Sequence, residues 1–410
     1  MSLNIPELRD QFPSLHQDVN GHPAMFLDGP GGTQTPQRVI DAMSDYLKRD
    51  NSNKGGHFRT SQNTVALVRS ARQAMADFYN ASRPEEIVFG ANMTTLTLNI
   101  SRSIARTWTP GDEIILTHID HFANVSPWLM AAEDRGVTVR WLDFEHHDCT
   151  LRLNDLDALL NERTQLVAIN YASNAVGTIS PVKKIVEKAR QVGAWTYVDA
   201  VHLAPHDVID VQALGCDFLV SSAYKYFGPH SGILYGKYEH LDQLTAYQVA
   251  PAPQTPPGKW ETGTQSFETI AGIKAAVDYI AGLSSKPGSR RERVADAMRQ
   301  IKDYEMALSQ RFLEGIATVP GARVYGITDV ERLDERTPTF GILLDGYTPE
   351  ELAKRLGEVG IFVWDGHYYA LDVIRRLGLL ESGGMVRIGF AHYNTFEEVD
   401  RLVETLRELA

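Results

Sequence analysis

Cysteine and long apolar runs are scarce in this chain of 410 residues. Its only two cysteines are Cys149 and Cys216, which excludes a disulfide framework and fits a reducing compartment. No run approaches the roughly 18 apolar residues that a membrane span needs. The opening stretch, MSLNIPELRDQF, carries charges and lacks the apolar core of a secretory signal. These absences predict a cytoplasmic protein with no membrane partner.

Positive charge is also in short supply. The chain has 40 Lys and Arg residues against 52 Asp and Glu residues, and its net charge is −12. This balance argues against nucleic acid as a partner. We predict no metal ligands. What remains is a globular chain whose length suits an enzyme.

Short apolar, β-branched runs alternate with longer segments of helical period. The runs read as strands at 85–90, 113–117, 137–144, 165–171, 194–200, 216–222 and 232–236. Helical stretches lie between several of them, at 95–107, 124–136 and 181–193. This alternation predicts an α/β fold with a mostly parallel seven-stranded sheet, covered on both faces. The last strand follows a short loop, so it should run antiparallel.

A proline-rich stretch separates this region from the rest. PAPQTPPG at 251–258 has four prolines in eight residues, which indicates a loop that closes a large domain at 26–260. A long helical segment begins at Ile273, strand candidates follow at 322–326 and 339–346, and a helix starts at Thr395. We expect residues 1–25 and 261–410 to form a smaller α+β domain.

Three polar features fall at predicted strand ends, where open parallel sheets bind ligands. Lys225 follows an apolar strand beside the hydroxyls of Ser222 and Tyr224. It is either a snorkelling lysine or a desolvated, nucleophilic amine. Asp199 ends the preceding strand, where it either caps a turn or faces a cation.

A polar turn supplies the third feature. Thr94 and Thr95 open the helix after strand 85–90. They are either ordinary N-cap residues or part of a phosphate site. A lysine, a strand-end acid and a phosphate turn are together what pyridoxal 5'-phosphate requires.

The stretch YVDAVHLAPHDVIDVQALGCDFLVSSAYKYFGPHSGILYG resembles the cofactor region of cysteine desulfurases. These belong to the class V aminotransferase family of fold type I pyridoxal phosphate enzymes. The likeness runs from FLDGPGGTQTP near residue 30 to VRIGFAHYNTFEEVDRL near the end. It implies the fold type I architecture of a large domain and a smaller C-terminal domain.

The resemblance implies a role for each matching residue around the ring. Lys225 matches the Schiff-base lysine and Asp199 the partner of the pyridine nitrogen. His121 matches the imidazole that stacks on the ring, and Asn174 an asparagine near the ring oxygen. His202 lies beside the same oxygen, where the family usually has glutamine.

Further matches concern the phosphate and the substrate. Tyr224 replaces a usual histidine next to the lysine, a position from which it can contact phosphate. Thr264 matches a threonine that reaches the phosphate of the neighbouring subunit, which implies a homodimer with shared active sites. Arg387 matches the arginine that holds the α-carboxylate of an amino-acid substrate, a pairing that suits the guanidinium fork. The glycine cluster at 29–32 is followed by no Gly-Lys-Ser/Thr, so we expect it to line the substrate mouth.

The likeness breaks at VWDGHYYALDV (363–373). Tyr369 stands where desulfurases carry the cysteine that accepts sulfur, and Trp364 stands where they usually have arginine. A phenol cannot accept sulfur as a persulfide. The loop aromatics Trp364, Tyr368 and Tyr369 either wall a substrate pocket or pack on a domain interface.

We therefore expect β-elimination, a C–S lyase reaction on cysteine or a cysteine S-conjugate. The alternatives are a class V aminotransferase, a cysteine desulfurase or selenocysteine lyase, and a non-catalytic scaffold that binds the cofactor.

Overall fold

The central sheet of the protein has seven strands. The computed structural model describes residues 3–410, so residues 1 and 2 of the predicted 1–25 segment lie outside the described residues. The strands are β4 (Ile87–Gly90), β5 (Glu113–Thr117), β6 (Thr138–Leu142), β7 (Thr164–Asn170), β8 (Trp195–Asp199), β9 (Phe218–Ser222) and β10 (Gly232–Gly236). Their order is β4-β10-β9-β8-β7-β5-β6, and only β10 runs antiparallel to its neighbours. The seven predicted strands and the antiparallel direction of the last one are confirmed.

Both faces of this sheet are apolar. Successive side chains of a strand point to opposite faces, so apolar residues that are neighbours in sequence pack into different clusters. Val88, Leu166 and Val220 belong to one buried cluster, whereas Ile87 and Val167 belong to another. The same alternation continues through the remaining strands. A sheet that is buried on both faces explains why the strands read as continuous apolar runs in the sequence.

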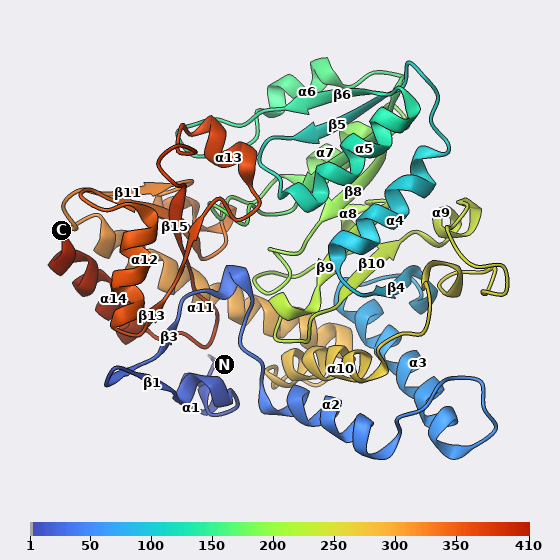
Figure 1. Ribbon diagram of the computed structural model, residues 1–410, viewed down its shortest axis with the longest axis horizontal. Helices are drawn as coiled ribbons and strands as arrows, with labels where there is room; N and C mark the ends of the chain where they lie inside the picture. Colours follow the sequence, from blue (N-terminus) through green and yellow to red (C-terminus); the bar gives the residue numbers. More distant parts are fainter. Residues whose placement is uncertain (1–2) are drawn as a thin grey trace.

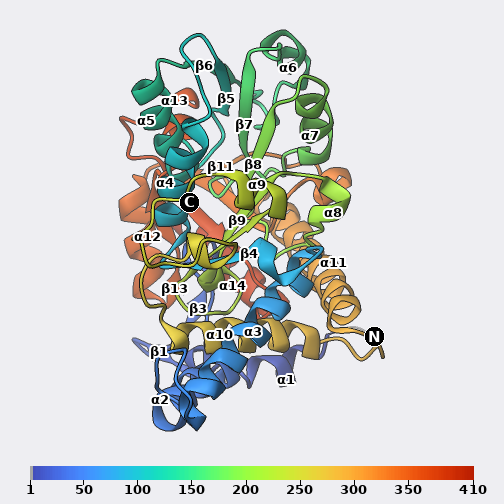
Figure 2. The same ribbon diagram turned by 90° about the vertical axis from the view of Figure 1, so that its right-hand side faces the viewer.

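Helices cover each face (Figures 1 and 2). One face packs against α4 (Met93–Ala105) and α5 (Ser126–Arg135). The other faces α3 (Arg59–Tyr79), α6 (Leu153–Leu159), α7 (Val182–Gln191), α8 (Val211–Leu214) and α10 (Phe267–Gly282). Outside these layers lie α2 (Gln37–Arg49), which packs on α10, and α9 (Tyr238–Gln243).

A second sheet of four strands lies at the left of Figure 1. Its order is β11 (Ala322–Tyr325), β12 (Thr339–Leu344), β15 (Met385–Gly389) and β14 (Trp364–Gly366), all antiparallel. The helices that accompany it are α11 (Arg290–Ile316), α12 (Pro349–Glu358), α13 (Leu371–Arg376) and α14 (Phe396–Leu409). Its core is a separate apolar cluster, which includes Phe312, Phe340 and Leu402. The boundaries 26–260 and 261–410 stay a prediction.

The N-terminal segment lies beside the C-terminal part of the chain and takes part in two small sheets. It contains α1 (Ile5–Arg9), the short pair β1 (Asp18–Val19) and β2 (His22–Pro23), and β3 (Met25–Phe26). β3 pairs in parallel with β13 (Ile361–Phe362), so segments far apart in sequence lie side by side. The 3₁₀ turn η2 (Gly29–Gly31) then leads toward the central sheet.

Of two helices expected in the C-terminal part, one needs correction and the other is confirmed. The single long helix expected from Ile273 is two helices, α10 and α11, because Pro287 and Gly288 interrupt the helical pattern before the N-cap at Ser289. The expected helix from Thr395 is α14, with Thr395 and Glu398 forming its capping box. No helix between residues 3 and 410 is both long and apolar enough to cross a membrane.

Candidate active site

The carboxyl ends of β7, β8 and β9 meet at one edge of the central sheet. Asn170 is in register with Asp199, and Asp199 with Val220, two residues before Ser222. A cavity of about 950 Å³ opens there. Ten of the predicted site residues line it: Thr94, His121, Asn174, Asp199, His202, Ser222, Tyr224, Lys225, Tyr369 and Arg387. Gly31 of the glycine cluster also lines it, as expected.

Lys225 is a buried amine at this edge. After β9 ends at Ser222, the 3₁₀ turn η5 (Ala223–Lys225) aims the side chain back toward η2, where Nζ donates to the Pro30 carbonyl. Burial is the largest influence on its pKa and Arg387 adds to it, so the pKa falls from 10.5 to about 7. Near neutral pH a large fraction of the amine is therefore unprotonated, the form that attacks carbonyl carbon and accepts protons.

Asp199 is a buried carboxylate without an ion-pair partner among residues 3–410. Its Oδ1 accepts a hydrogen bond of 2.9 Å from the Val201 N–H. Burial raises its pKa to about 6, although the charge on Lys225 opposes that rise. A cation placed against this carboxylate would restore its charge, as a protonated ring nitrogen does.

Helix α4 begins at the rim of the cavity. Its N-cap is Asn92, whose Oδ1 accepts from the N–H of Thr95 at 2.8 Å and from its hydroxyl at 2.9 Å. The first N–H groups of the helix, at Met93 and Thr94, have no acceptor within the helix. Gly232 lets β10 pass close beneath, because a Cβ there would meet the Asn92 and Met93 backbone. A helix start beside a cationic pocket suits a phosphate.

Two imidazoles face the cavity, and both are neutral. His121 Nδ1 accepts from the Ala123 N–H at 3.0 Å, and burial together with Lys225 and Arg387 lowers its pKa to about 4. His202 lies within 3.2 Å of the Thr337 hydroxyl through Nε2, and burial holds its pKa well below the usual value. Neither ring competes with Lys225 as a cation.

Arg387 is a buried guanidinium with spare donors. It comes from β15, donates from Nη1 to the Asn174 carbonyl at 3.0 Å, and lies 4.3 Å from the Tyr368 ring centroid. Its Nε and the Oδ1 of Asn174 are buried and have no hydrogen-bond partner among residues 3–410. No carboxylate in that range forms an ion pair with it. Such a cation is prepared for an anionic ligand.

The loop after β14 closes over this end of the cavity. Tyr368 and Tyr369 have positive φ angles of 52° and 58°, and the Asn174 side chain donates to the Tyr368 carbonyl at 2.9 Å. The Tyr369 ring stacks on His121 with centroids 5.4 Å apart. The residue that the resemblance matches to the desulfurase cysteine is thus a phenol that stacks on His121 at the site.

Neither cysteine lines this cavity. Cys149 and Cys216 are both buried, with no exposed surface. Burial raises the pKa of each thiol to about 12. Cys216 precedes β9 and so lies at the opposite strand end from Lys225. Each thiol is thus held in its unreactive, protonated form.

Two predicted residues lie outside the cavity lining. The Thr95 hydroxyl is bonded to Asn92, and Thr264 is exposed on the loop before α10. Sequence reasoning missed Asn92, whose N-cap preference was the available signal. It also missed Asp28, whose Oδ1 is buried without a hydrogen-bond partner among residues 3–410 and whose pKa burial raises to about 6. No local sequence signal pointed to Asp28.

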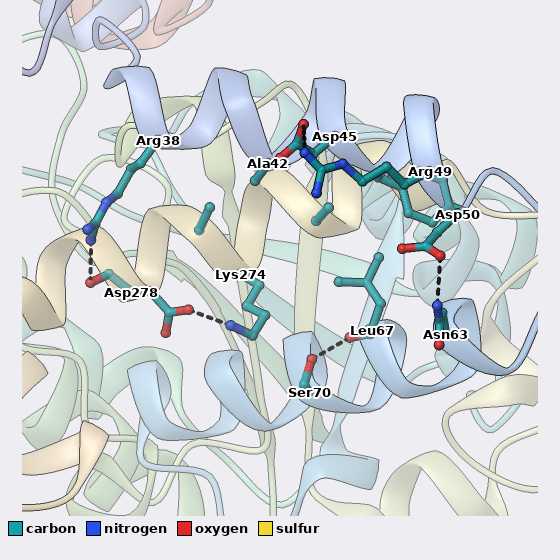
Figure 3. Close-up of a pocket in the computed structure, with 13 residues that line it drawn as sticks. Arg38, Ala42, Asp45, Arg49, Asp50, Asn63, Leu67, Ser70, Lys274 and Asp278 are labelled. Carbon is teal, nitrogen blue, oxygen red and sulfur yellow. Dashed lines mark hydrogen bonds and ion pairs between the residues drawn. The ribbon is translucent and has the colours of Figure 1, made fainter. Parts of the chain in front are cut away.

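A second cavity, of about 590 Å³, lies between α2, α3 and α10 (Figure 3). Its polar residues are largely bonded to one another, as in the pair of Lys274 with Asp278 and the bond from Asn63 to Asp50. None of the predicted site residues lines it. The candidate active site is therefore the cavity at the sheet edge.

A central, mostly parallel sheet with a lysine and a carboxylate at its carboxyl edge defines an α/β enzyme of fold type I. Residues 25–402 match the aminotransferase class-V family profile, so the chain belongs to that family. Its members use pyridoxal 5'-phosphate, and this protein is a pyridoxal phosphate enzyme. The unpaired Asp199, the Lys225 amine and the α4 start fit that cofactor.

Curated relatives are similar along the whole chain. The cysteine desulfurase of Pectobacterium carotovorum subsp. carotovorum is 34% identical, with 100% of this chain and 98% of that protein covered. The cysteine desulfurase of Synechococcus elongatus is 32% identical over 100% of this chain, which spans 64% of that relative. The chain likewise spans 58% of the probable cysteine desulfurase of Mycolicibacterium paratuberculosis, to which it is 34% identical.

Solved structures agree with the fold. The apo cysteine desulfurase from Thermococcus onnurineus NA1 superposes with a TM-score of 0.89 at 26% identity, covering 100% of this chain and 98% of that one. The cysteine desulfurase CsdA (S-sulfonic acid) from Escherichia coli gives 0.86 at 25% identity, with the same coverage.

Proposed function

We propose that the enzyme eliminates a sulfur substituent from Cβ of cysteine or a cysteine S-conjugate. The overall reaction takes up one water and releases one thiol, one keto acid and one ammonia. The observation that carries this proposal is the position of the thiols. Both cysteines are buried with a raised pKa, neither lines the cavity, and the residue that the resemblance matches to the sulfur acceptor is Tyr369.

Each of the three charged groups has a separate task. Arg387 binds the α-carboxylate through its spare donors, which fixes the amino acid in the cavity. Lys225, whose pKa burial lowers to about 7, accepts the proton from Cα. Asp199 would hold the positive charge of the cofactor ring. The bound cofactor supplies the electron sink for the charge that develops at Cα.

Sulfur then departs directly from Cβ as a thiol or sulfide. This step requires no protein nucleophile, because the electron pair of the broken C–H bond forms the Cα–Cβ double bond and the C–S pair leaves with sulfur. A persulfide route requires a reactive thiolate next to the substrate sulfur. Tyr369 cannot supply one, because a phenol carries no sulfur and its oxygen is a hard nucleophile.

Cysteine desulfuration is the second candidate, because relatives that are 32% to 34% identical carry that name. The two candidates differ in their products. Desulfuration leaves alanine and a protein-bound persulfide, whereas elimination leaves keto acid and ammonia.

The test is a substrate panel. Purified holoenzyme is incubated with cysteine, cysteine sulfinate, S-alkyl cysteines and alanine, and keto acid, ammonia, sulfide, thiol and alanine are measured together. Elimination predicts equal amounts of keto acid and ammonia. Glutamate-dependent amine exchange without thiol release would instead establish an aminotransferase.

A further inference from the structure

The outer part of the active-site cavity carries several exposed apolar side chains next to the polar Asn92, Asp365 and His367, whereas its inner end is charged. Asp199, Lys225 and Arg387 are at most 8% exposed. Met130, Trp364 and Tyr369 line the same cavity and are 58%, 51% and 67% exposed. The apolar side chains of the lining include Leu98, Phe122, Pro127, Met130, Trp364 and Tyr369. The lining therefore combines buried charged groups with exposed apolar surface.

One wall comes from the second sheet. Trp364 on β14 is directly paired with Arg387 on β15. Directly opposed residues of antiparallel strands project from the same face of a sheet. The indole also packs on η2, where Trp364 Nε1 occupies the space that a Cβ on Gly31 would need. Trp364 is thus held beside the guanidinium that we assign to the substrate carboxylate.

The facing wall comes from helices and a turn that cover the central sheet. Leu98 belongs to α4, Met130 to α5, and Phe122 to the 3₁₀ turn η4 (Phe122–Asn124). A hydrogen bond of 2.8 Å from the Phe122 N–H to the Tyr369 carbonyl joins this wall to the β14 loop. The stack of Tyr369 on His121 adds a second contact between the walls. The two walls therefore enclose one subsite.

We propose that this subsite binds an extended apolar substituent on the substrate side chain. The substrate class is then an L-amino acid with an alkyl or aryl group beyond Cβ, such as an S-alkyl or S-aryl cysteine, rather than free cysteine. That such a substrate undergoes elimination rests on the proposed function. That the subsite binds its apolar substituent does not depend on that function. The ionic groups of the amino acid meet the charged end, and the substituent covers apolar surface that solvent otherwise contacts.

The first measurement compares S-methyl, S-ethyl, S-propyl and S-butyl L-cysteine with the holoenzyme. Burial of one methylene is worth ~0.8 kcal/mol, which corresponds to about fourfold in kcat/KM. We expect kcat/KM to rise about fourfold at each step of the series. A flat series, with keto acid still formed from β-chloro-L-alanine, overturns the subsite and leaves the elimination function standing.

The second measurement separates binding from elimination. L-alanine, L-norvaline and L-norleucine have no leaving group, so they act as competitive ligands, whose binding is followed by the absorbance of the bound cofactor. We expect dissociation constants to fall by about fourfold per methylene. If β-chloro-L-alanine yields no keto acid, the elimination function fails, yet this series still tests the subsite. Equal constants for the three ligands overturn it.

Variants at the two walls test whether these residues cause the dependence of kcat/KM and of the dissociation constants on chain length. Trp364→Ala and Met130→Ala, one from each wall, should flatten both series to less than about twofold per methylene. The cofactor absorbance of each variant reports whether its site is intact. Tyr247→Ala is the control, because Tyr247 is 46% exposed but does not line the cavity. An unchanged dependence on chain length in both wall variants contradicts the proposal.

Discussion

Replacing Lys225 by methionine should stabilise the apoprotein at low pH. Methionine fills a similar volume without the charge, and burial lowers the pKa of Lys225 from 10.5 to about 7. At 1.36 kcal/mol for each tenfold change in proton affinity, the buried charge opposes folding by roughly 5 kcal/mol. Below pH 7 the amine is charged in both the folded and the unfolded chain, so the whole penalty is present. As pH rises from 7 to 10.5 the folded state loses its proton first and the penalty disappears.

The assay is urea denaturation of the wild-type and Lys225→Met apoproteins, prepared by removing the cofactor because bound ligand stabilises the folded state. We expect the variant to be more stable by roughly 5 kcal/mol at pH 6 and by about 1.5 kcal/mol at pH 9.5. Lys184→Met, at an exposed lysine, should show no such difference at either pH. A gap that does not change with pH, or a variant less stable than wild type at pH 6, would refute the reasoning about burial.

Three further predictions concern the holoenzyme. Arg387→Ala should lower kcat/KM by about ten- to a few hundred-fold, because a hydrogen bond to a charged group contributes roughly 1.5–3 kcal/mol; an unchanged value in steady-state kinetics would move the carboxylate site elsewhere. The purified protein should be yellow and should retain cofactor on residue 225 after borohydride reduction, whereas Lys225→Ala should lose both that label and turnover. Full activity in this variant would exclude Lys225 as the attachment site. Light scattering should give a homodimer, since the resemblance assigns the exposed Thr264 to the neighbouring subunit's site, and an active monomer at assay concentration would exclude shared sites.

Much of the fold could be predicted because the central strands are buried on both faces. Runs such as QLVAINY and CDFLVSS have few polar residues, so their β character is local information. The connection lengths then fixed the strand directions. Asp199 and Lys225 could be placed at one edge because Asp199 lies near the end of one such run and Lys225 comes three residues after another.

The rest of the site depends on contacts that the sequence does not display. β14 has three residues, and β15 has a central arginine, so neither has a clear strand pattern. The pairing of Trp364 with Arg387 therefore appears only in the folded chain. Arg387 itself was found through resemblance. The stack of Tyr369 on His121 joins residues more than two hundred positions apart.

The most direct test of the central claim is the ratio of alanine to pyruvate formed from cysteine or an S-alkyl cysteine. The assay uses the wild-type holoenzyme and a Cys149→Ser, Cys216→Ser double variant, with mass spectrometry of each protein after turnover. Elimination that uses no protein thiol predicts pyruvate and ammonia in equal amounts, little alanine, and the same rate in both proteins. Mostly alanine, with a persulfide on Cys149 or Cys216 and activity lost in the double variant, would contradict it.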